Sequence, residues 1–257
     1  MEFKTILPQL IELTTKTGEE ILSHYQTGTS VSFKDNNTPL TIADQSAHNI
    51  IVAGLSLMTP DIPILSEESD AISFTQRSQW DEYWLVDPLD GTRDFIEETG
   101  EFCICIAYIK NHKTIFGLVA VPLESAHYYG FDGNAYKYQN GIEQRINTCT
   151  TSKPLRVVTG HYSSKNSTLL SHLTQLGECQ HFHLGSALKF CRIAEGVYDY
   201  YPRFGPCSEW DTAAGVCILE SAGGSVVDKN GDFLKYNTKD DLLSPAFFAF
   251  GTKTPTF

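Results

Sequence analysis

The sequence contains no run of about 18 apolar residues, no cluster of basic residues and no C-x-x-C pair. The first absence argues against a membrane-spanning helix. The second absence, with 19 Lys and Arg against 31 Asp and Glu and a net charge of −12, argues against nucleic-acid polymers and anionic membrane surfaces as partners. A small anionic ligand stays open, because a bound metal ion can reverse the local field.

The first twenty residues become polar and acidic too early for a secretory signal, so we expect a cytoplasmic protein. Seven cysteines, an odd number, lack metal-ligand spacing. They are Cys103, Cys105, Cys149, Cys179, Cys191, Cys207 and Cys217. In a chain without an export signal this pattern predicts buried free thiols and gives little support for a metal or redox role.

Hydrophobic residues make up 41% of the chain and charged residues 19%, which predicts a folded protein rather than a disordered one. Helical spacing predicts helices at 3–26, 41–57, 167–176, 186–195 and 211–221. Short apolar or alternating runs predict strands at 62–65, 83–86, 102–109, 114–121, 126–131, 134–138, 155–159, 197–201, 225–228 and 246–250.

Two helices, a run of strands and then alternating helices and strands predict an α/β chain of stacked helix and sheet layers (α+β layered). Its 257 residues suffice for one large domain or two small ones. We expect a half at 1–150 and a half at 151–257 to form one compact unit, with the active cleft between them.

The most informative stretch, Tyr83–Phe95, reads YWLVDPLDGTRDF. An apolar strand carries Asp87 to its end, the following proline ends the pairing, and Gly91 permits a sharp turn. Asp87 and Asp90 can then point into one pocket with the Leu89 carbonyl between them. Oxygen ligands of this kind suit Mg²⁺ rather than zinc. Taken alone, the motif is equally compatible with a plain turn, since Asp, Pro and Gly are common turn residues.

Carboxylates at three other places in the chain favour the metal site. Glu67 and Glu68 follow a short apolar strand, Asp211 stands at the start of a helix, and Asp44 stands at the start of another. For Asp44 and Asp211 the alternative is helix capping or a favourable first-turn charge.

Four of these carboxylates would repel one another in one cleft. They are Glu67, Asp87, Asp90 and Asp211. At an effective dielectric constant near 20, one such pair at about 4 Å costs roughly 4 kcal/mol. Without cations the cluster would protonate or open, whereas with two or three divalent ions it becomes a phosphate-binding site. Gly91 and Thr92 add backbone N–H groups and a hydroxyl that can cradle phosphate oxygens.

The segments LSEE, WLVDPLDGTRDF and WDTAAG resemble the signature motifs of the inositol monophosphatase-like phosphatases, which are Mg²⁺-dependent and lithium-sensitive. The resemblance continues through NxPLTxAD at 37–44, GEF at 100–102, LKFC at 188–191, AEG at 194–196 and YPRFGP at 201–206. LKFC and YPRFGP point to the branch that acts on 3'(2'),5'-bisphosphate nucleotides.

The resemblance implies an αβαβα sandwich and a phosphatase that converts 3'-phosphoadenosine 5'-phosphate to AMP and phosphate, clearing a by-product of sulfate assimilation. It implies attack by a metal-activated water without a covalent phosphoenzyme. The alternative within the superfamily is another small phosphomonoester: an inositol monophosphate, a sugar bisphosphate or the 2'-phosphate of NADP.

The resemblance also implies two metal ions. The first site is matched by Glu67, Asp87 and the Leu89 carbonyl. The second is matched by Asp87, Asp90 and Asp211. A weaker third ion would lie near Asp44 and Glu68.

The expected catalytic residues are Asp44, Thr92 and Glu68, with Asp44 and Thr92 orienting and deprotonating the attacking water. Gly91 and Thr92 match backbone positions that touch the departing phosphate. Substrate contacts are also expected at the metal-binding positions Glu67, Leu89, Asp90 and Asp211. Arg93 stands where lysine or threonine is common in relatives, and we assign it no role.

A bisphosphorylated nucleotide needs cations for its second phosphate. The candidates are Lys189, Arg203, His161 and Ser163. Each has a plain alternative, because a lone charged side chain often serves only the solvated surface.

A hypothesis from another class is a catalytically silent nucleotide sensor. It is disfavoured because the carboxylates and the water-activating pair of Asp44 and Thr92 are all present. For the oligomeric state, base rates alone favour a homodimer. A peripheral association with the inner face of the cell membrane is a further possibility that the sequence leaves open.

Overall fold

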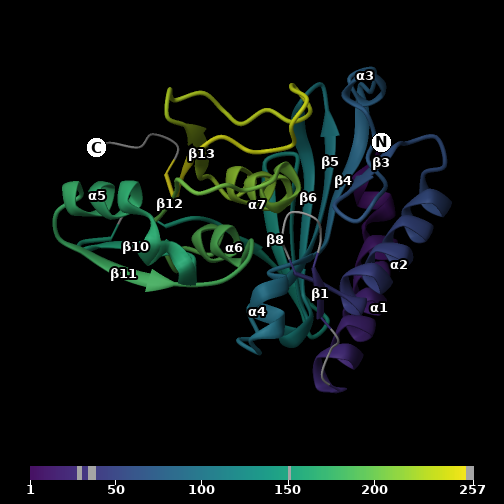
Figure 1. Ribbon diagram of the computed structural model, residues 1–257, viewed down its shortest axis with the longest axis horizontal. Coiled ribbons are helices and arrows are strands. Elements are labelled where there is room, and N and C mark those ends of the chain that lie inside the picture. The colour runs from purple at the N-terminus through teal and green to yellow at the C-terminus, as the bar shows by residue number, and fades with distance from the viewer. Residues whose placement is uncertain (28–30, 34–38, 150–151, 253–257) are drawn as a thin grey trace.

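The strands pair into two large sheets that alternate with helices (Figure 1). The computed structural model describes residues 1–27, 31–33, 39–149 and 152–252. The seven-stranded sheet has the order β3-β4-β5-β6-β7-β8-β9, and the five-stranded sheet has the order β11-β10-β12-β14-β13. A two-stranded sheet joins β1 (Val31–Phe33) to β2 (Pro39–Thr41).

The bounds of the elements are as follows. The seven-stranded sheet contains β3 (Ile64–Ser66), β4 (Glu82–Asp90), β5 (Cys103–Lys110), β6 (Lys113–Val121), β7 (Ala126–Phe131), β8 (Asn134–Gln139) and β9 (Ile142–Ile146). The five-stranded sheet contains β10 (Leu155–Thr159), β11 (Cys179–His183), β12 (Tyr200–Arg203), β13 (Ser225–Asp228) and β14 (Phe247–Phe250). The helices are α1 (Phe3–Thr27), α2 (Ile42–Met58), α3 (Phe74–Arg77), α4 (Thr92–Ile96), α5 (Ser167–Gln175), α6 (Leu188–Ala194) and α7 (Glu209–Ser221).

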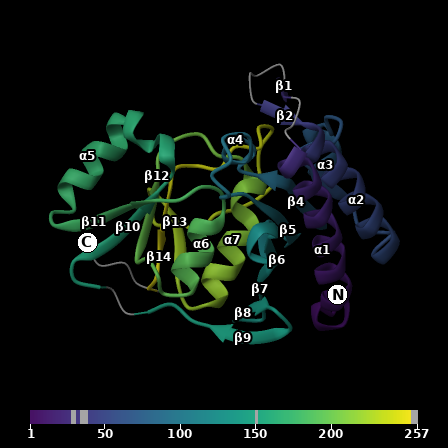
Figure 2. The same cartoon turned by 90° about the horizontal axis from the view of Figure 1, so that it is seen from below.

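Five layers follow one another across the molecule. Helices α1 and α2 cover one face of the seven-stranded sheet, α6 and α7 lie between the two sheets, and α5 lies on the far side of the five-stranded sheet (Figures 1 and 2). The expected αβαβα sandwich is therefore confirmed.

Strand β4 shows why its sequence is almost continuously apolar. Tyr83 and Leu85 face the core shared with α6 and α7, whereas Trp84 and Val86 face the core under α1 and α2. A strand with helices on both faces has no solvent side, so the alternation of apolar and polar residues disappears.

Helix α7 is buried nearly all round because it lies in the middle layer. It approaches the seven-stranded sheet closely at Gly117, where an added Cβ would come within 2.4 Å of the Ala214 carbonyl oxygen. This close approach fixes the depth at which the first turn of α7 enters the cleft.

Most expected elements are present within a few residues of their expected bounds, and the differences are local. The strand expected at 197–201 begins only at Tyr200, because the Val197 N–H bonds back to the Arg192 carbonyl in the turn after α6. The chain reaches β10 with the bond from the Asp199 N–H to the Arg156 carbonyl. The short helices α3 and α4 and the strands β9 and β11 were not among the expected elements. The motif at 37–44 includes residues 37 and 38, which lie outside the described residues, as does the expected boundary near residue 150.

The seven cysteines are free thiols, as expected. Five of them are buried, whereas Cys149 and Cys179 are half-buried, so the expectation of burial was wrong for these two. In the described part of the chain, every helix is too short or too polar to cross a membrane.

Candidate active site

Two carboxylates leave the seven-stranded sheet at the same edge. Strands β3 and β4 are parallel, and Ser66 pairs with Val86. The next residue in each chain segment is acidic, so Glu67, just after β3, and Asp87, within β4, lie side by side. The Glu67 N–H donates to the Val86 carbonyl at 3.0 Å, which holds the turn after β3 against the end of β4.

The end of β4 is a bulge rather than a stop. Asp87 pairs with Cys105 and Asp90 pairs with Cys103, with a register shift between the two pairs. The expectation that the proline ends the pairing was therefore wrong, because Pro88 falls inside the bulge, where no ladder donor is needed. The Leu89 N–H donates to Asp87 Oδ1 at 3.0 Å, which ties the bulge together.

Gly91 then makes the sharp turn into α4. Its φ of 93° lies in the left-handed region that favours glycine, and an added Cβ would come within 2.9 Å of the Glu101 carbonyl oxygen. The turn directs Thr92 into the cleft.

Two further carboxylates come from helix starts. Asp44 and Asp211 are each the third residue of their helix, and each accepts a bond from the backbone N–H of the residue before the helix, Thr41 and Ser208, at 2.8 and 2.9 Å. The capping alternative is thus realised for both residues. It does not compete with a role in the site, because Asp44 caps through Oδ2 and turns Oδ1 toward Thr92.

The strand ends and the start of α7 bring three carboxylates together. Glu67, Asp87 and Asp211 each offer an oxygen within 4.8 Å of the others. Asp90 lies beside them, and its Oδ2 accepts a bond from the Ala187 N–H.

The cluster is electrostatically unfavourable without cations. Burial first, and then Glu67, Asp90 and Asp211, raise the pKa of Asp87 well above its ordinary value. Burial raises the pKa of Asp90 to about 6, against the opposing charge of Lys189, and burial with the neighbouring carboxylates raises that of Asp211 to about 7. A nearby cation therefore favours the ionised form of each of these three carboxylates.

The donor set fits hard divalent cations. The clustered donors are carboxylate oxygens, and the Leu89 carbonyl belongs to the same bulge as Asp87 and Asp90. Oxygen ligands of both kinds are those that Mg²⁺ and Ca²⁺ prefer in proteins. Glu68 follows Glu67 in the turn after β3 and is half-buried.

The pair of Asp44 and Thr92 is also present. The Thr92 hydroxyl donates to Asp44 Oδ1 at 2.9 Å and lies 3.2 Å from the Leu89 carbonyl oxygen. Asp44 is 2% exposed, and burial raises its pKa. Thr41 Oγ1 holds the other carboxylate oxygen at 2.6 Å, so the pair has a defined orientation.

Two neighbouring cavities share several lining residues, and carboxylates of the cluster border the first of them. The first, of about 150 Å³, is lined by Asp90, Gly91, Asp211, His161, Lys189 and Arg203, among others. The second, of about 230 Å³, is lined by Arg93, Tyr162, Ser163, Asn166, Arg203 and Phe204, among others. Arg203 is common to both cavities, so three of the four residues expected at the second phosphate border the first cavity and Ser163 borders the second.

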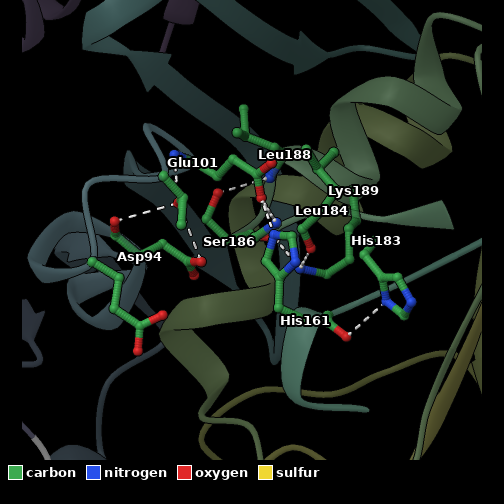
Figure 3. A network of polar contacts seen from close by, with 12 residues as sticks. Asp94, Glu101, His161, His183, Leu184, Ser186, Leu188 and Lys189 are labelled. Atoms are coloured by element: carbon green, nitrogen blue, oxygen red, sulfur yellow. Dashed lines mark hydrogen bonds and ion pairs between the residues drawn. The ribbon is translucent and has the colours of Figure 1, made fainter. Parts of the chain in front are cut away.

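Lys189 borders the first cavity but is already engaged in hydrogen bonds (Figure 3). It is 4% exposed, and its Nζ donates to the carbonyl oxygens of Leu184, at 3.0 Å, and Ser186. These bonds hold the turn that presents the Ala187 N–H to Asp90. The geometry therefore favours a positioning role for Lys189 over the expected contact with the second phosphate.

His161 is also engaged. Its Nε2 lies 2.5 Å from Glu101 Oε2, which also accepts the Gly185 N–H, and Asp94 completes a three-residue group with ligand atoms within 4.8 Å (Figure 3). Asp94 and Glu101 were not among the expected site residues, although Glu101 stands in the GEF segment that the sequence analysis noted. Their link to His161 depends on the turn after β10, which sequence spacing does not reveal.

Arg93, to which the sequence assigned no role, lies over the ring of Tyr162 at 4.6 Å from its centroid. It lines the second cavity with Arg203. The sequence signal for this arrangement was weak, because Arg93 and Tyr162 are 69 positions apart in the numbering and meet only across the cleft.

A comparison with protein families matches residues 3–249 to the model described as "Inositol monophosphatase family". The chain belongs to the inositol monophosphatase family.

Several relatives in this family are similar over nearly the whole chain. The chain is 41% identical over 244 residues to the 3'(2'),5'-bisphosphate nucleotidase CysQ of Salmonella typhimurium, covering 94% of this chain and 98% of that protein. A crystal structure of CysQ from Bacteroides thetaiotaomicron superposes with a TM-score of 0.84 at 34% identity, covering 98% of this chain and 99% of that one. An IMPase from Thermotoga maritima superposes with a TM-score of 0.78 at 26% identity, covering 95% and 91%.

Phosphatases of the inositol monophosphatase family depend on metal ions, and the acidic cluster of this chain is able to hold metal. The pKa values of Asp90 and Asp211 are raised above their unfolded-state values, so both groups stabilise the metal-free fold at low pH. That contribution is lost as the pH rises through about 6 to 7.

We therefore expect Mg²⁺ to raise the melting temperature more at pH 8 than at pH 5, because the cation binds the ionised carboxylates. At a concentration about 100-fold above Kd, the gain is about 2.7 kcal/mol, or roughly 5–10 °C for a chain of this size. Scanning calorimetry with Mg²⁺ and with EDTA at both pH values measures it. Asp211→Asn is expected to lose most of the shift and the exposed Asp61→Asn to keep it; equal shifts at both pH values would contradict the prediction.

Proposed function

We propose that this phosphatase hydrolyses 3'-phosphoadenosine 5'-phosphate, and related 3'(2'),5'-bisphosphate nucleotides, to AMP and phosphate with the help of Mg²⁺. The observation that carries the phosphatase chemistry is the group of Glu67, Asp87 and Asp211 within 4.8 Å, beside the bonded pair of Asp44 and Thr92. The choice of nucleotide rests on the 41% identity to a 3'(2'),5'-bisphosphate nucleotidase over almost the full length of both chains.

The proposed ligands divide between two ions. One ion would be held by Glu67, Asp87 and the Leu89 carbonyl. The other would be held by Asp87, Asp90 and Asp211. A third, weaker position would involve Asp44 and Glu68. When bound, Mg²⁺ neutralises the carboxylates and stabilises the negative charge that develops on the phosphoryl and leaving oxygens.

The chain's own residues would orient and deprotonate the attacking water. The Thr92 hydroxyl donates its one proton to Asp44, so its lone pairs are available to accept a hydrogen bond from water. Burial raises the pKa of Asp44, which makes its carboxylate a stronger proton acceptor than an exposed one. The backbone N–H groups of Gly91 and Thr92 are the proposed contacts to the phosphate that departs.

The second phosphate of the substrate needs a cation with donors to spare. Arg203 supports this role, because it borders both cavities and has five N–H donors. Its Nη2 donates to the Pro206 carbonyl at 2.8 Å, whereas its buried Nε has no hydrogen-bond partner among the described residues. Ser163 borders the second cavity with Arg203, and His161 borders the first. Both stay candidates for the same phosphate.

Two alternatives differ in substrate or in class. An inositol monophosphatase would use the same carboxylates without the second phosphate, and a sensor would bind nucleotide without turnover. Lithium sensitivity, a place in sulfur metabolism, a cytoplasmic location and a homodimer stay predictions.

Phosphate release from 3'-phosphoadenosine 5'-phosphate, inositol 1-phosphate and fructose 1,6-bisphosphate, each with Mg²⁺ and with EDTA, tests the proposal. We expect a strong preference for the nucleotide in kcat/KM and no turnover in EDTA. Preference for inositol 1-phosphate would keep the carboxylates in their roles and reject the nucleotide. Binding of nucleotide without turnover on any substrate would favour the sensor.

Asp44→Asn tests the water-activating pair. The amide keeps the bond from the Thr41 N–H but cannot accept a proton, so we expect kcat to fall about 10²- to 10⁴-fold while nucleotide affinity stays nearly unchanged. Single-turnover kinetics and equilibrium binding separate the two quantities. Asp61→Asn, on the exposed surface, serves as control, and turnover at the parental rate in Asp44→Asn would reject Asp44 as the base.

Arg203→Met and Lys189→Met separate substrate contact from positioning. Loss of a hydrogen bond to a charged group costs about 1.5–3 kcal/mol, so we expect Arg203→Met to raise KM for the bisphosphate about 10- to 100-fold and to leave KM for inositol 1-phosphate nearly unchanged. Lys189→Met is expected to lower kcat and raise the Mg²⁺ requirement with every substrate, because the turn that holds Asp90 loosens. If Lys189→Met instead raised KM for the bisphosphate alone, Lys189 rather than Arg203 would be assigned to the second phosphate.

A further inference from the structure

Two thiols lie beneath the floor of the cleft. Cys103 and Cys105 are alternate residues of β5 and therefore share one face of the strand, toward the middle layer of the sandwich. Their Sγ atoms are 3.7 Å apart, and Cys103 Sγ is 3.7 Å from Asp90 Oδ2. Asp90 lines the first cavity, so its carboxylate connects the buried thiols to the open cleft.

The bulge at the end of β4 creates this juxtaposition. Asp90 pairs with Cys103 across the sheet after the register shift, which brings its carboxylate over the strand position of the thiols. Ser186 Oγ lies 3.5 Å from Cys103 Sγ and also borders the cavity. Asp90, Cys103 and Cys105 thus each offer a ligand atom within 4.8 Å of the others, and the Ser186 hydroxyl lies beside Cys103.

The spacing matches the coordination of a thiophilic cation. Tetrahedral zinc with Zn–S bonds of about 2.3 Å and Zn–O bonds of about 2.1 Å places its sulfur ligands about 3.8 Å apart and sulfur about 3.6 Å from oxygen. The corresponding separations here are 3.7 Å and 3.7 Å. The third pair, Cys105 and Asp90, has ligand atoms within 4.8 Å of each other, so the three groups are close enough to bind one such ion together.

We propose that Cys103, Cys105 and Asp90 form a site for a thiophilic divalent cation, Zn²⁺ or Cd²⁺, whose binding withdraws Asp90 from the magnesium-dependent reaction. Binding exchanges two thiol protons, released to solvent, for one divalent cation, while the Asp90 carboxylate stays ionised. A fourth ligand would come from Ser186 Oγ, which lies 3.5 Å from Cys103 Sγ, or from water.

The donor types separate this site from the carboxylate cluster. Soft thiolate ligands select zinc-like ions, whereas carboxylates and carbonyls suit Mg²⁺. The two sites share Asp90, so a soft ion would compete with Mg²⁺ for one ligand and bring two of its own that Mg²⁺ does not use. The neighbouring carboxylates of Asp87 and Asp211 add a negative field that draws in either cation.

Other cysteines lack this combination. Cys207 Sγ lies 3.4 Å from Asp211 Oδ2, but it is a single thiol in that contact. Cys217 is buried in α7, and its Sγ donates to the Gly130 carbonyl oxygen at 3.3 Å. Cys217 is therefore a matched control for a buried thiol outside the site.

The expected inhibition by a thiophilic ion rests on the proposed function, since it requires Asp90 to hold the catalytic cations. Binding of the thiophilic ion to the thiols does not depend on that function.

Titration of the reduced protein with Cd²⁺ reports binding through the thiolate-to-metal charge-transfer absorption in the near ultraviolet. We expect a saturable band with one equivalent of Cd²⁺ in the wild type and in Cys217→Ala. The band is expected to be lost in Cys105→Ala and Cys105→Ser, the serine preserving side-chain volume.

Inhibition of phosphate release by buffered Zn²⁺ at constant Mg²⁺ completes the test. We expect the inhibition constant to rise at least about tenfold in both Cys105 variants, with activity in Mg²⁺ alone retained, and to stay unchanged in Cys217→Ala. Absence of the Cd²⁺ band in the wild type, or its persistence in the Cys105 variants, would overturn the site. A Cd²⁺ band without inhibition by Zn²⁺ would overturn the inference that the ion withdraws Asp90 from the reaction. An enzyme inactive on every substrate would overturn the proposed function, and in that case the Cd²⁺ band alone would show whether the thiol site exists.

Discussion

The repulsion among buried carboxylates is the constraint on which the rest of the active site depends. Asp87 and Asp90 come from one bulged strand end, Glu67 from the parallel strand beside it, and Asp211 from a helix in the middle layer. The fold holds these groups together although burial and mutual repulsion raise the pKa values of Asp87, Asp90 and Asp211. Such a cluster binds cations because they relieve the repulsion among the carboxylates. The bound cations would in turn attract the negatively charged phosphate of the substrate.

The scaffold meets this constraint with ordinary local devices. Asp44 and Asp211 each accept, with one oxygen, the N–H of the residue that precedes their helix, which fixes each carboxylate in place before any ligand arrives. Lys189 satisfies two carbonyls of the turn that presents the Ala187 N–H to Asp90. Each device is explicable as simple stabilisation, yet together they preorganise the residues that the proposed chemistry requires.

The two thiols of β5 contribute to core packing and also lie close to the active site. On one face of β5, Cys103 and Cys105 help to fill the core under the cleft, where small sulfur side chains pack against α6 and α7. The same face lies within reach of Asp90 because β4 bulges at that point. Sensitivity to soft cations would then be a consequence of filling that core with cysteine rather than with an aliphatic residue.

The sequence by itself determined the layered fold class and the carboxylate positions, because apolar periodicity and the D-P-x-D-G and W-D-x-A-x-G motifs are local properties. It did not reveal the bulge at Pro88, the engagement of Lys189 by two carbonyls, or the groups that join His161 to Glu101 and Arg93 to Tyr162. The proximity of Cys103 and Cys105 to Asp90 was equally hidden, since their spacing resembles no metal motif. Only the tertiary structure decided these contacts. Most of them depend on the register between strands or on the meeting of the two sheets across α6 and α7, whereas the bonds of Lys189 to Leu184 and Ser186 depend on the path of the turn before α6. The spacing of residue types along the sequence encodes neither the register nor that path.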